Sequence, residues 1–343
     1  MRLAAQTEAD LSAWAASRGA APGGARALAR ALLAGFAGRP VRELPSGGLL
    51  AEARARFESG LPDAETARDA DGTVRFAVRL GDGNQVETVA IHQAASELRA
   101  KERWTVCLSS QVGCARGCVF CETGRLGLRR NLDAAEIVSQ YALVARHLGF
   151  APRNVVFMGM GEPLDNLEAV LRAVAVLREP AGFAVPERRI TVSTVGIVPR
   201  MDELFARSRV NLAVSLHAID PAVRRALLPV ARRWELGELR AAIARAPRTV
   251  LLQWTLIASV NDSDREADAL AEFARGLGVR VNLIPLNPGP DPSQHAPPLE
   301  RCRAFQRRLA AHGVRTLLRL PHGQSVGGAC GQLAGELRSR AQA

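Results

Sequence analysis

A strand followed by a helix, repeated along the chain from about residue 104, is the feature that most restricts the fold. The strand-like runs are apolar, and they lie at 104–108, 155–158, 190–193, 210–216, 250–256 and 279–284. Helical stretches separate them, for example 132–148, 164–177, 199–205, 236–246 and 264–277, and a helix at 299–312 and a strand at 314–320 follow. Such β/α units predict a parallel sheet, either an open doubly wound sheet or an incomplete (β/α)6-type barrel. We expect the barrel, because residues suited to catalysis stand just after strand ends, where a barrel has its active site.

The amino-terminal part of the chain has a different pattern. Alanine-rich helical segments around 11–18 and 25–36 are separated by Ala21-Pro22-Gly23-Gly24. Two further runs, 73–80 and 86–91, flank a Gly-Asp-Gly-Asn turn, which is typical of a β-hairpin. These segments predict a small accessory region of helices and a hairpin.

Length and composition agree with this division. The 343 residues suit one large domain with an appendage, and 48% hydrophobic residues are enough for a sizeable core, which excludes a disordered or fibrous protein. We predict an N-terminal accessory domain at 1–95, a partial-barrel core at 96–335 and a C-terminal tail at 336–343.

The net charge of +11 indicates a polyanionic partner. Nearly all basic residues are arginine and alanine is abundant, so part of this charge reflects composition bias. Fifteen aromatic residues (10 Phe, 4 Trp, 1 Tyr) are too few for a broad base-stacking surface, so we expect phosphate contacts and one extruded base. The candidate phosphate contacts, each of which is alternatively a solvated helix face, are Arg129-Arg130, Arg188-Arg189, Arg224-Arg225, Arg232-Arg233 and Arg307-Arg308.

The start of the chain carries acidic residues where a signal peptide would be basic and then apolar, and no apolar run approaches the roughly 18 residues of a membrane span. We therefore expect a cytoplasmic protein with no membrane partner and with reduced thiols.

A closely spaced cysteine triplet, Cys114, Cys118 and Cys121, follows the first strand of the β/α units. Three thiolates at this spacing can hold three irons of a [4Fe–4S] cluster and leave the fourth iron open to a substrate or cofactor. A zinc site would need four ligands, and neither a second Cys-x2-Cys nor a nearby His-x3-His completes one. Three unligated core cysteines are the other alternative, and the Gly, Arg and Glu residues around the triplet disfavour it.

The triplet, with Phe120 before its last cysteine, resembles the signature of the radical S-adenosylmethionine enzymes. A narrower resemblance, to the RlmN/Cfr family of RNA adenine methyltransferases, rests on seven blocks in that family's order, over about residues 85 to 335. The blocks are Trp104-Thr-Val-Cys-Leu-Ser-Ser-Gln-Val-Gly-Cys114, Phe157-Met-Gly-Met-Gly-Glu-Pro-Leu164, Ser193-Thr-Val-Gly-Ile-Val-Pro199, Leu212-Ala-Val-Ser-Leu-His-Ala218, Val260-Asn-Asp262, Asn282-Leu-Ile-Pro-Leu-Asn-Pro288 and Ala329-Cys-Gly-Gln-Leu333. The resemblance implies a radical S-adenosylmethionine barrel with a [4Fe–4S] cluster, S-adenosylmethionine, an RNA substrate and an electron donor such as flavodoxin or ferredoxin.

The resemblance also implies a cofactor pocket. Gly161 and Glu162 follow the second strand, where a carboxylate and a free backbone can hold a cationic amino group; alone, they are a Gly-Glu-Pro turn that starts a helix. The resemblance also assigns to this pocket Ser193, Ser215, Leu216, His217 and Asn287. Without the resemblance, these are ordinary strand-end hydroxyls, a helix-capping imidazole and their neighbours.

Two further cysteines match the family's catalytic thiols. Cys330, in a Gly-rich segment, matches the methyl-carrying cysteine, and Cys107 matches the resolving cysteine. The implied reaction uses one S-adenosylmethionine to methylate Cys330 and a second to generate a 5′-deoxyadenosyl radical that takes a hydrogen from this methyl group. The methylene radical then adds to an adenine carbon, and Cys107 attacks the sulfur of Cys330 to release the product. Alone, each thiol is a small buried hydrophobe, which is how we interpret Cys302.

Loss of the proton from the adenine carbon requires a base. Glu87 stands at the position that the family proposes for it, and the alternative is a solvent-facing residue of the hairpin.

In the cofactor pocket, Val195 replaces a second serine of the family, so we expect Ser193 alone to contribute there. Two other departures concern the substrate: 320–329 replaces an Arg-Gly-x-Asp-Ile-like stretch, and 93–101 lengthens an edge near the site. The resemblance implies C2 methylation of an adenosine in 23S ribosomal RNA, with transfer RNA as a further candidate substrate. The alternatives are C8 methylation, another RNA, or a non-catalytic iron–sulfur or zinc RNA-binding module.

Overall fold

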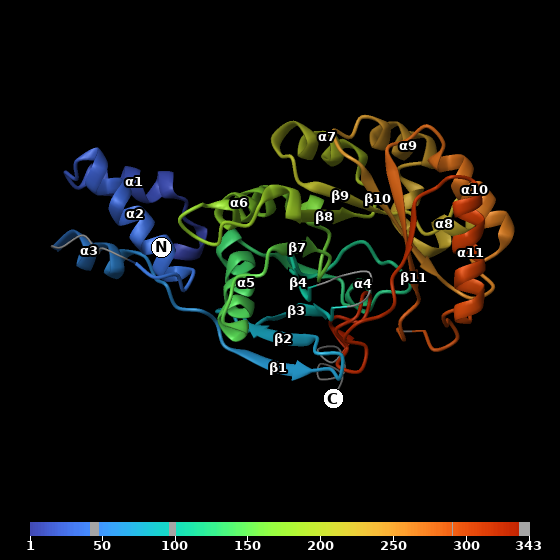
Figure 1. Cartoon of the computed structure of the whole chain (residues 1–343), viewed down its shortest axis with the longest axis horizontal. Helices are drawn as coiled ribbons and strands as arrows, with labels where there is room; N and C mark the ends of the chain where they lie inside the picture. Colours follow the sequence, from blue (N-terminus) through green and yellow to red (C-terminus); the bar gives the residue numbers. More distant parts are fainter. Residues whose placement is uncertain (42–47, 96–100, 290, 336–343) are drawn as a thin grey trace.

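A computed structural model of the chain (Figure 1) describes residues 1–41, 48–95, 101–289 and 291–335. Its centre is one sheet with the strand order β1-β2-β3-β4-β7-β8-β9-β10-β11-β12. The strands are β1 (Ala64–Arg68), β2 (Val74–Arg79), β3 (Gln85–Gln93), β4 (Arg103–Cys107), β7 (Asn154–Phe157), β8 (Ile190–Thr194), β9 (Asn211–Ser215), β10 (Val250–Leu256), β11 (Val279–Pro285) and β12 (Thr316–Leu318). The predicted tail at 336–343 lies outside the described residues, as does most of the 93–101 stretch.

From β4 to β12 every neighbouring pair of strands is parallel. These strands follow one another in chain order, whereas a doubly wound sheet reverses its order part-way. The order therefore confirms the incomplete barrel. Helices that connect or cover the strands are α5 (Ala134–Leu148), α6 (Leu167–Arg178), α7 (Val198–Arg207), α8 (Pro221–Leu227), α9 (Leu236–Ala244), α10 (Asp264–Ala274) and α11 (Leu299–Ala311).

Capping residues fix the two ends of α5, the helix that precedes β7. Asp133 and Glu136 form a reciprocal capping box at the start of α5, and Gly149 ends the helix in the left-handed conformation at φ 75°. Both signals are readable in the sequence, which is why the predicted bounds of 132–148 agree with the structure.

The predicted hairpin exists as β2 and β3, but it belongs to the barrel's sheet. β1, β2, β3 and β4 pair antiparallel in succession, so the hairpin extends the parallel sheet on its β4 side. Val74, Phe76 and Val86 are part of the main hydrophobic core. The structure therefore separates only the first helices from the barrel, whereas the sequence placed the whole of 1–95 in one accessory domain.

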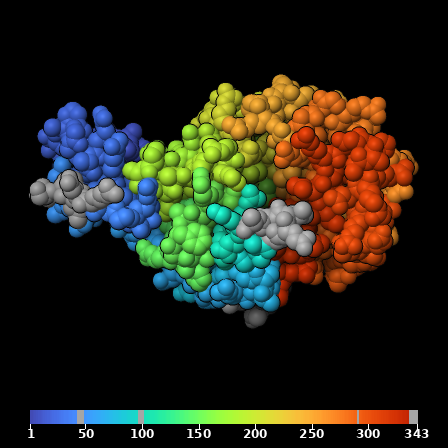
Figure 2. All heavy atoms as spheres, in the orientation of Figure 1, coloured from blue at the N-terminus to red at the C-terminus, as the bar shows by residue number. Residues whose placement is uncertain are grey.

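The amino-terminal helices have a core of their own. α1 (Glu8–Ser17), α2 (Pro22–Phe36) and α3 (Gly48–Arg56) pack through a separate cluster that includes Leu11 and Leu28. Figure 2 shows them projecting at one end of the molecule. Arg39 joins the two parts by donating to the carbonyl oxygens of Pro180 and Gly182 at 2.7 and 3.0 Å.

A small antiparallel pair, β5 (Gln111–Gly113) and β6 (Leu128–Asn131), flanks the short helix α4 (Glu122–Arg125). The loop between β5 and α4 carries the cysteine triplet. Among the described residues, no helix has the length and apolar character needed to cross a membrane.

Candidate functional site

The carboxyl ends of the parallel strands lead to one cavity. Thr194 and Ser215 stand at the ends of β8 and β9, and Thr255 is next to the end of β10. Most of the predicted site residues line this cavity: Cys114, Cys118, Cys121, Gly161, Glu162, Ser193, Ser215, His217, Asn287 and Cys330. The structure therefore brings together residues from seven separate stretches of the sequence in the arrangement that a barrel site requires.

Close backbone packing fixes the cysteine loop. A Cβ atom on Gly124 would lie 3.1 Å from the backbone N and O of Cys118, and one on Gly113 would lie 1.8 Å from the carbonyl oxygen of Gly127. Gly113 also has a φ of 79°. Only glycine fits position 113, and a side chain at position 124 would require its neighbours to shift, so the glycines beside the cysteines serve the shape of the loop.

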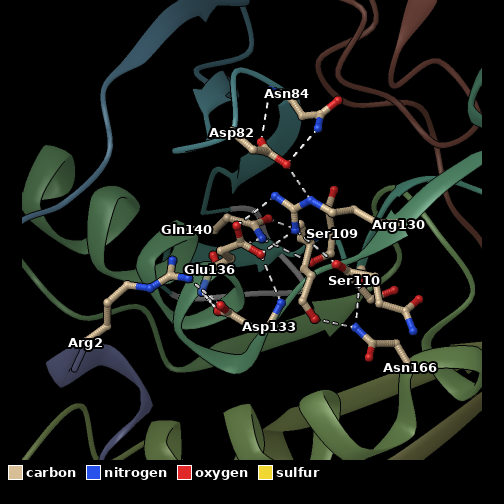
Figure 3. Close-up of polar contacts among 12 residues, drawn as sticks. Arg2, Asp82, Asn84, Ser109, Ser110, Arg130, Asp133, Glu136, Gln140 and Asn166 are labelled. Atoms are coloured by element: carbon tan, nitrogen blue, oxygen red, sulfur yellow. Dashed lines mark hydrogen bonds and ion pairs between the residues drawn. The ribbon is translucent and has the colours of Figure 1, made fainter.

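Helix side chains hold the segment that leads from β4 into the loop (Figure 3). Gln140 of α5 accepts from the backbone N–H of Ser109 at 2.9 Å and donates to its carbonyl oxygen at 3.1 Å. Asn166 donates to the carbonyl oxygen of Ser110 at 2.8 Å. These buried amides form hydrogen bonds with backbone groups that lie outside the strand pairing. They therefore fix the direction in which the chain approaches the cysteines.

The three thiols share a buried environment. Burial raises the pKa of Cys114 to about 12, and it raises the pKa values of Cys118 and Cys121 as well, with the charges of neighbouring thiolates adding to the effect at Cys118. Among the residues that the structure describes, no three His, Cys, Asp or Glu side chains converge on a point suited to one metal ion. A cubane cluster requires a different arrangement, because each thiolate binds a separate iron.

Glu162 is a buried carboxylate at the edge of the same cavity. Its side chain accepts from the backbone N–H groups of Leu164 at 3.0 Å and Val195 at 2.9 Å, and the residue is 3% exposed. Burial raises the pKa of Glu162 to about 7, and these hydrogen bonds oppose that shift. Within the described part of the chain Glu162 forms no ion pair, so a cation in the cavity would stabilise its charged form.

Arg224 of α8 is a buried cation beside the cysteine loop. It is 2% exposed, and its one side-chain hydrogen bond within the described residues is donated by Nη2 to the carbonyl oxygen of Val195 at 3.5 Å. The Nε and Nη1 atoms have no partner among the described residues. Burial lowers the pKa of Arg224 to about 10, and the charge of Cys118 opposes this shift. An uncompensated buried guanidinium favours a negatively charged neighbour.

His217 has a structural contact on the cavity wall. Its Nδ1 accepts from the backbone N–H of Thr255 at 2.9 Å, and its ring meets that of Phe120 edge-on with centroids 4.8 Å apart. Burial, with a smaller effect of Arg224, lowers the pKa of His217 to about 3. The imidazole is therefore neutral at physiological pH. Leu216, next to it, points away from the cavity and is fully buried.

Cys107 and Cys330 line a second, smaller cavity that adjoins the first. Met158 and Asn287 line both cavities. Cys107 is buried and Cys330 is exposed, and Asn287 fixes the Cys330 segment by donating to its carbonyl oxygen at 3.0 Å. Burial and the nearby Cys330 raise the pKa of Cys107 well above its usual range.

Glu87 lies away from both cavities and from solvent. It lines neither cavity, and it is not a solvent-facing hairpin residue, because it is 1% exposed. Its carboxylate forms an ion pair with Arg75 and accepts from the backbone N–H of Ala334 at 2.6 Å. In this arrangement Glu87 anchors the segment that follows Cys330.

The sequence did not identify several cavity residues, among them Arg116, Gln253 and Thr255. Gln253 and Thr255 alternate in the otherwise apolar β10, and two polar residues on one face of a buried strand are a readable signal for a lined cavity. Arg116 pairs with Asp165 through Nε at 2.7 Å, a contact that sequence spacing could not reveal.

The basic pairs separate into different classes. Arg130 is paired with Asp82 at 2.6 Å and Glu136 at 2.8 Å, and Arg308 is paired with Asp268 at 2.6 Å. The prediction that Arg224 contacts phosphate is wrong, because this side chain is buried. Arg188 and Arg189 line a third cavity.

Comparison with known proteins places this site in a family. Residues 108–279 match the family described as the radical SAM superfamily. A probable RNA methyltransferase of Sorangium cellulosum is 50% identical over 81% of this chain and 70% of its own, and the dual-specificity RNA methyltransferase RlmN of Syntrophobacter fumaroxidans is 44% identical over 78% of each chain. The chain belongs to the RlmN/Cfr family. A crystal structure of a radical SAM methyltransferase from Sphaerobacter thermophilus, 39% identical, superposes with a TM-score of 0.85 over 97% of this chain and 99% of that one.

RlmN/Cfr enzymes carry a [4Fe–4S] cluster and use S-adenosylmethionine, and the residues present fit both. Cys114, Cys118 and Cys121 supply three partly buried thiols at one cavity. The unpartnered nitrogens of Arg224 suit the negative charge of a thiolate-bound cluster. Glu162, a buried carboxylate without an ion pair in the described chain, suits the amino group of S-adenosylmethionine.

Proposed function

We propose that this RNA methyltransferase methylates C2 of an adenosine in 23S ribosomal RNA, with transfer RNA as a second substrate. The relatives from Syntrophobacter fumaroxidans and Syntrophotalea carbinolica are named dual-specificity RNA methyltransferases. The observation that carries the proposal is the placement of Cys107 and Cys330 on one cavity that adjoins the cavity of the cysteine triplet. A methyltransferase acting on a nucleophilic atom needs no such pair, because its substrate attacks the methyl donor directly.

Bound in the cavity of the cysteine triplet, the cluster and S-adenosylmethionine would supply a methyl group and a 5′-deoxyadenosyl radical, with the reducing electron from a carrier such as flavodoxin or ferredoxin. The residues proposed to hold them are Cys114, Cys118 and Cys121 for the cluster, and Gly161, Glu162, Ser193, Ser215, Leu216, His217 and Asn287 for S-adenosylmethionine. Leu216 would contribute through its backbone, since its side chain is buried behind the strand end.

Cys330 is proposed to carry the methyl group to the adenine carbon, to which it becomes joined through a thioether. The exposed position of Cys330 in a Gly-rich segment suits a thiol that meets two reactants in turn. Cys107 then attacks the sulfur of Cys330. A disulfide forms, the carbon–sulfur bond breaks with its electron pair on carbon, and a proton completes the methyl group.

Glu87 is proposed as the base that takes the proton from the adenine carbon. Its carboxylate already accepts from the backbone of Ala334 and pairs with Arg75. The role therefore requires the segment after Cys330 to move and release this carboxylate toward the base.

Mass spectrometry of nucleosides tests the proposed product. Ribosomal and transfer RNA from cells that contain the protein should yield 2-methyladenosine, and RNA from cells that lack it, or that carry Cys330→Ala, should have lost the nucleoside at the sites of this enzyme. Cys302→Ala is the matched control, because Cys302 is buried outside both cavities. Finding 8-methyladenosine would contradict the proposed carbon, and RNA unchanged by loss of the protein would contradict the function.

A further inference from the structure

The opposite end of the barrel carries a cavity that the reaction described so far does not use. It has a volume of about 530 Å³ and is lined near the amino ends of the parallel strands, by Asn154 in β7, Thr191 in β8, Asn211 in β9 and Leu251 in β10. The cluster cavity lies at the carboxyl ends of the same strands. The two cavities therefore open toward opposite edges of the partial barrel.

Positive charge is concentrated around this mouth. Arg103, Arg188, Arg189 and Arg319 line it, and among the described residues no aspartate or glutamate does. In the described part of the chain, Arg188 and Arg319 have no carboxylate partner, in contrast to Arg130 and Arg308. Four arginines from three segments around one opening suit a ligand with several phosphates.

Apolar side chains lie beside these arginines at the mouth. Leu317 and Leu320 line the same mouth and are each 56% exposed, which makes them two of the most exposed large apolar side chains in the described structure. Deeper in the wall, the Oδ1 atom of the fully buried Asn282 accepts no hydrogen bond from the described residues. A nucleic acid strand combines anionic phosphates, flat apolar base faces and N–H donors, and so it matches all three features.

The mouth leads to the catalytic thiols. Arg319, Leu320 and His322 line both the mouth and the small cavity that holds Cys107 and Cys330, and Met158 lines all three cavities. Arg319 is also close enough for its charge to act on the pKa of Cys107. The small cavity with Cys107 and Cys330 therefore adjoins the mouth on one side and the cavity of the cysteine triplet on the other.

We infer that this arginine-lined mouth binds the RNA strand on both sides of the target nucleotide and admits its base to Cys330 from the amino-terminal edge of the barrel. The inference rests on the proposed function. Arg188, Arg189 and Arg319 hold phosphates, and Leu317 and Leu320 contact base or sugar faces. Approach from this edge leaves the opposite edge for S-adenosylmethionine, so the two reactants do not compete for one opening.

Binding of a fluorescein-labelled RNA hairpin with an adenosine-rich loop to the anaerobically prepared holoenzyme tests this inference. Arg188→Gln, Arg189→Gln and Arg319→Gln should each weaken binding several-fold and reduce the slope of log K against log salt concentration by about 1. Arg275→Gln is the matched control, because Arg275 is exposed, pairs with Glu272 at 2.7 Å and lies outside the mouth. Iron content and thermal unfolding of each variant, measured in parallel, identify any loss of fold.

Unchanged affinity and salt slope in all three mouth variants would overturn the inference. Charge reversal by Arg188→Glu provides a second measurement, since repulsion of phosphate should exceed the effect of neutralisation.

The experiment distinguishes failure of the arginine-lined mouth from failure of the proposed function. Variants that bind RNA as the unmodified protein does while the RNA is still methylated would contradict the mouth alone. If the unmodified protein does not methylate RNA, and the variants still bind RNA more weakly than it does, the mouth would be supported and the proposed function contradicted.

Discussion

At the scale of single residues, burial of uncompensated charge marks the site. Glu162 and Arg224 are both at most 3% exposed, and neither forms an ion pair within the described chain. A chain that folds without ligands keeps such groups at a cost in stability, because each is removed from water without an opposite charge. Their positions beside the cysteine loop indicate which charges the cofactors bring.

Substitution of Glu162 tests one of these positions. Glu162→Gln removes a charge and retains the shape, so affinity for S-adenosylmethionine should fall roughly tenfold to a hundredfold, the effect of one charged hydrogen bond. Because the pKa of Glu162 is raised to about 7, the carboxylate is charged above this pH and neutral below it. Affinity of the unmodified protein should therefore decrease as pH falls through about 7.

Equilibrium binding of labelled S-adenosylmethionine between pH 6 and pH 8 is the measurement. The Glu162→Gln protein should bind weakly with little dependence on pH in this range. Equal affinity of the two proteins at pH 8, with iron content matched, would contradict the assignment.

Residue roles that depend on local spacing were readable from the sequence, and those that depend on tertiary contacts were not. The cysteine triplet occupies one loop, so its spacing alone indicated shared ligation. Glu87 contacts Ala334, which is 247 positions away in the chain, and no local pattern reveals that contact. Arg224 looked like half of a basic surface pair, and only the packing of α8 shows that it is buried.

At the scale of elements, the β1–β2 turn holds the segment that carries Cys330. Asp71 accepts from the backbone N–H of Gly323 at 3.1 Å and contacts Nδ1 of His322 at 3.0 Å. Asp69 accepts from the backbone N–H of Ser325 at 2.9 Å. These contacts fall within the stretch that departs from the family pattern, so this chain holds the segment before Cys330 through the β1–β2 turn.

Asp71→Ala should loosen that segment. Loss of the acceptor leaves the backbone of Gly323 and the ring of His322 without their partner, so amide hydrogen exchange at 322–325 should become faster. Asp82→Ala is the control, because Asp82 stands at the β2–β3 turn and pairs with Arg130. If amide hydrogen exchange at 322–325 is equally fast in the two variants and the unmodified protein, this role of the β1–β2 turn would be contradicted.

The elements themselves were largely predictable, because buried apolar strands and capped helices leave local signals. The assignment of the hairpin failed for a physical reason. Alternating residues in 73–80 predict a strand, but they do not say which sheet it joins, and that is decided by pairing of β3 with β4. The short β1, with its exposed AETAR sequence, carries no apolar alternation by which it could be recognised.

At the scale of the whole molecule, three cavities lie along one partial barrel. The strand order in chain sequence places the cysteine triplet at one edge and the arginine-lined mouth at the other, with Cys107 and Cys330 between them. β/α repetition predicted the barrel and its catalytic edge. The mouth was not predictable, because its arginines become neighbours only when β4, β8 and β12 are arranged in one sheet.

We propose that Cys330 carries the methyl group and that Cys107 releases the product. Cys107→Ala holoenzyme incubated with RNA and S-adenosylmethionine under reduction should accumulate a covalent protein–RNA adduct on a denaturing gel, because the thioether lacks its attacking thiol. The Cys107→Ala, Cys330→Ala double variant should form no adduct, and Cys302→Ala should turn over without accumulating one. A Cys107→Ala enzyme that releases methylated RNA and traps no adduct would contradict the account.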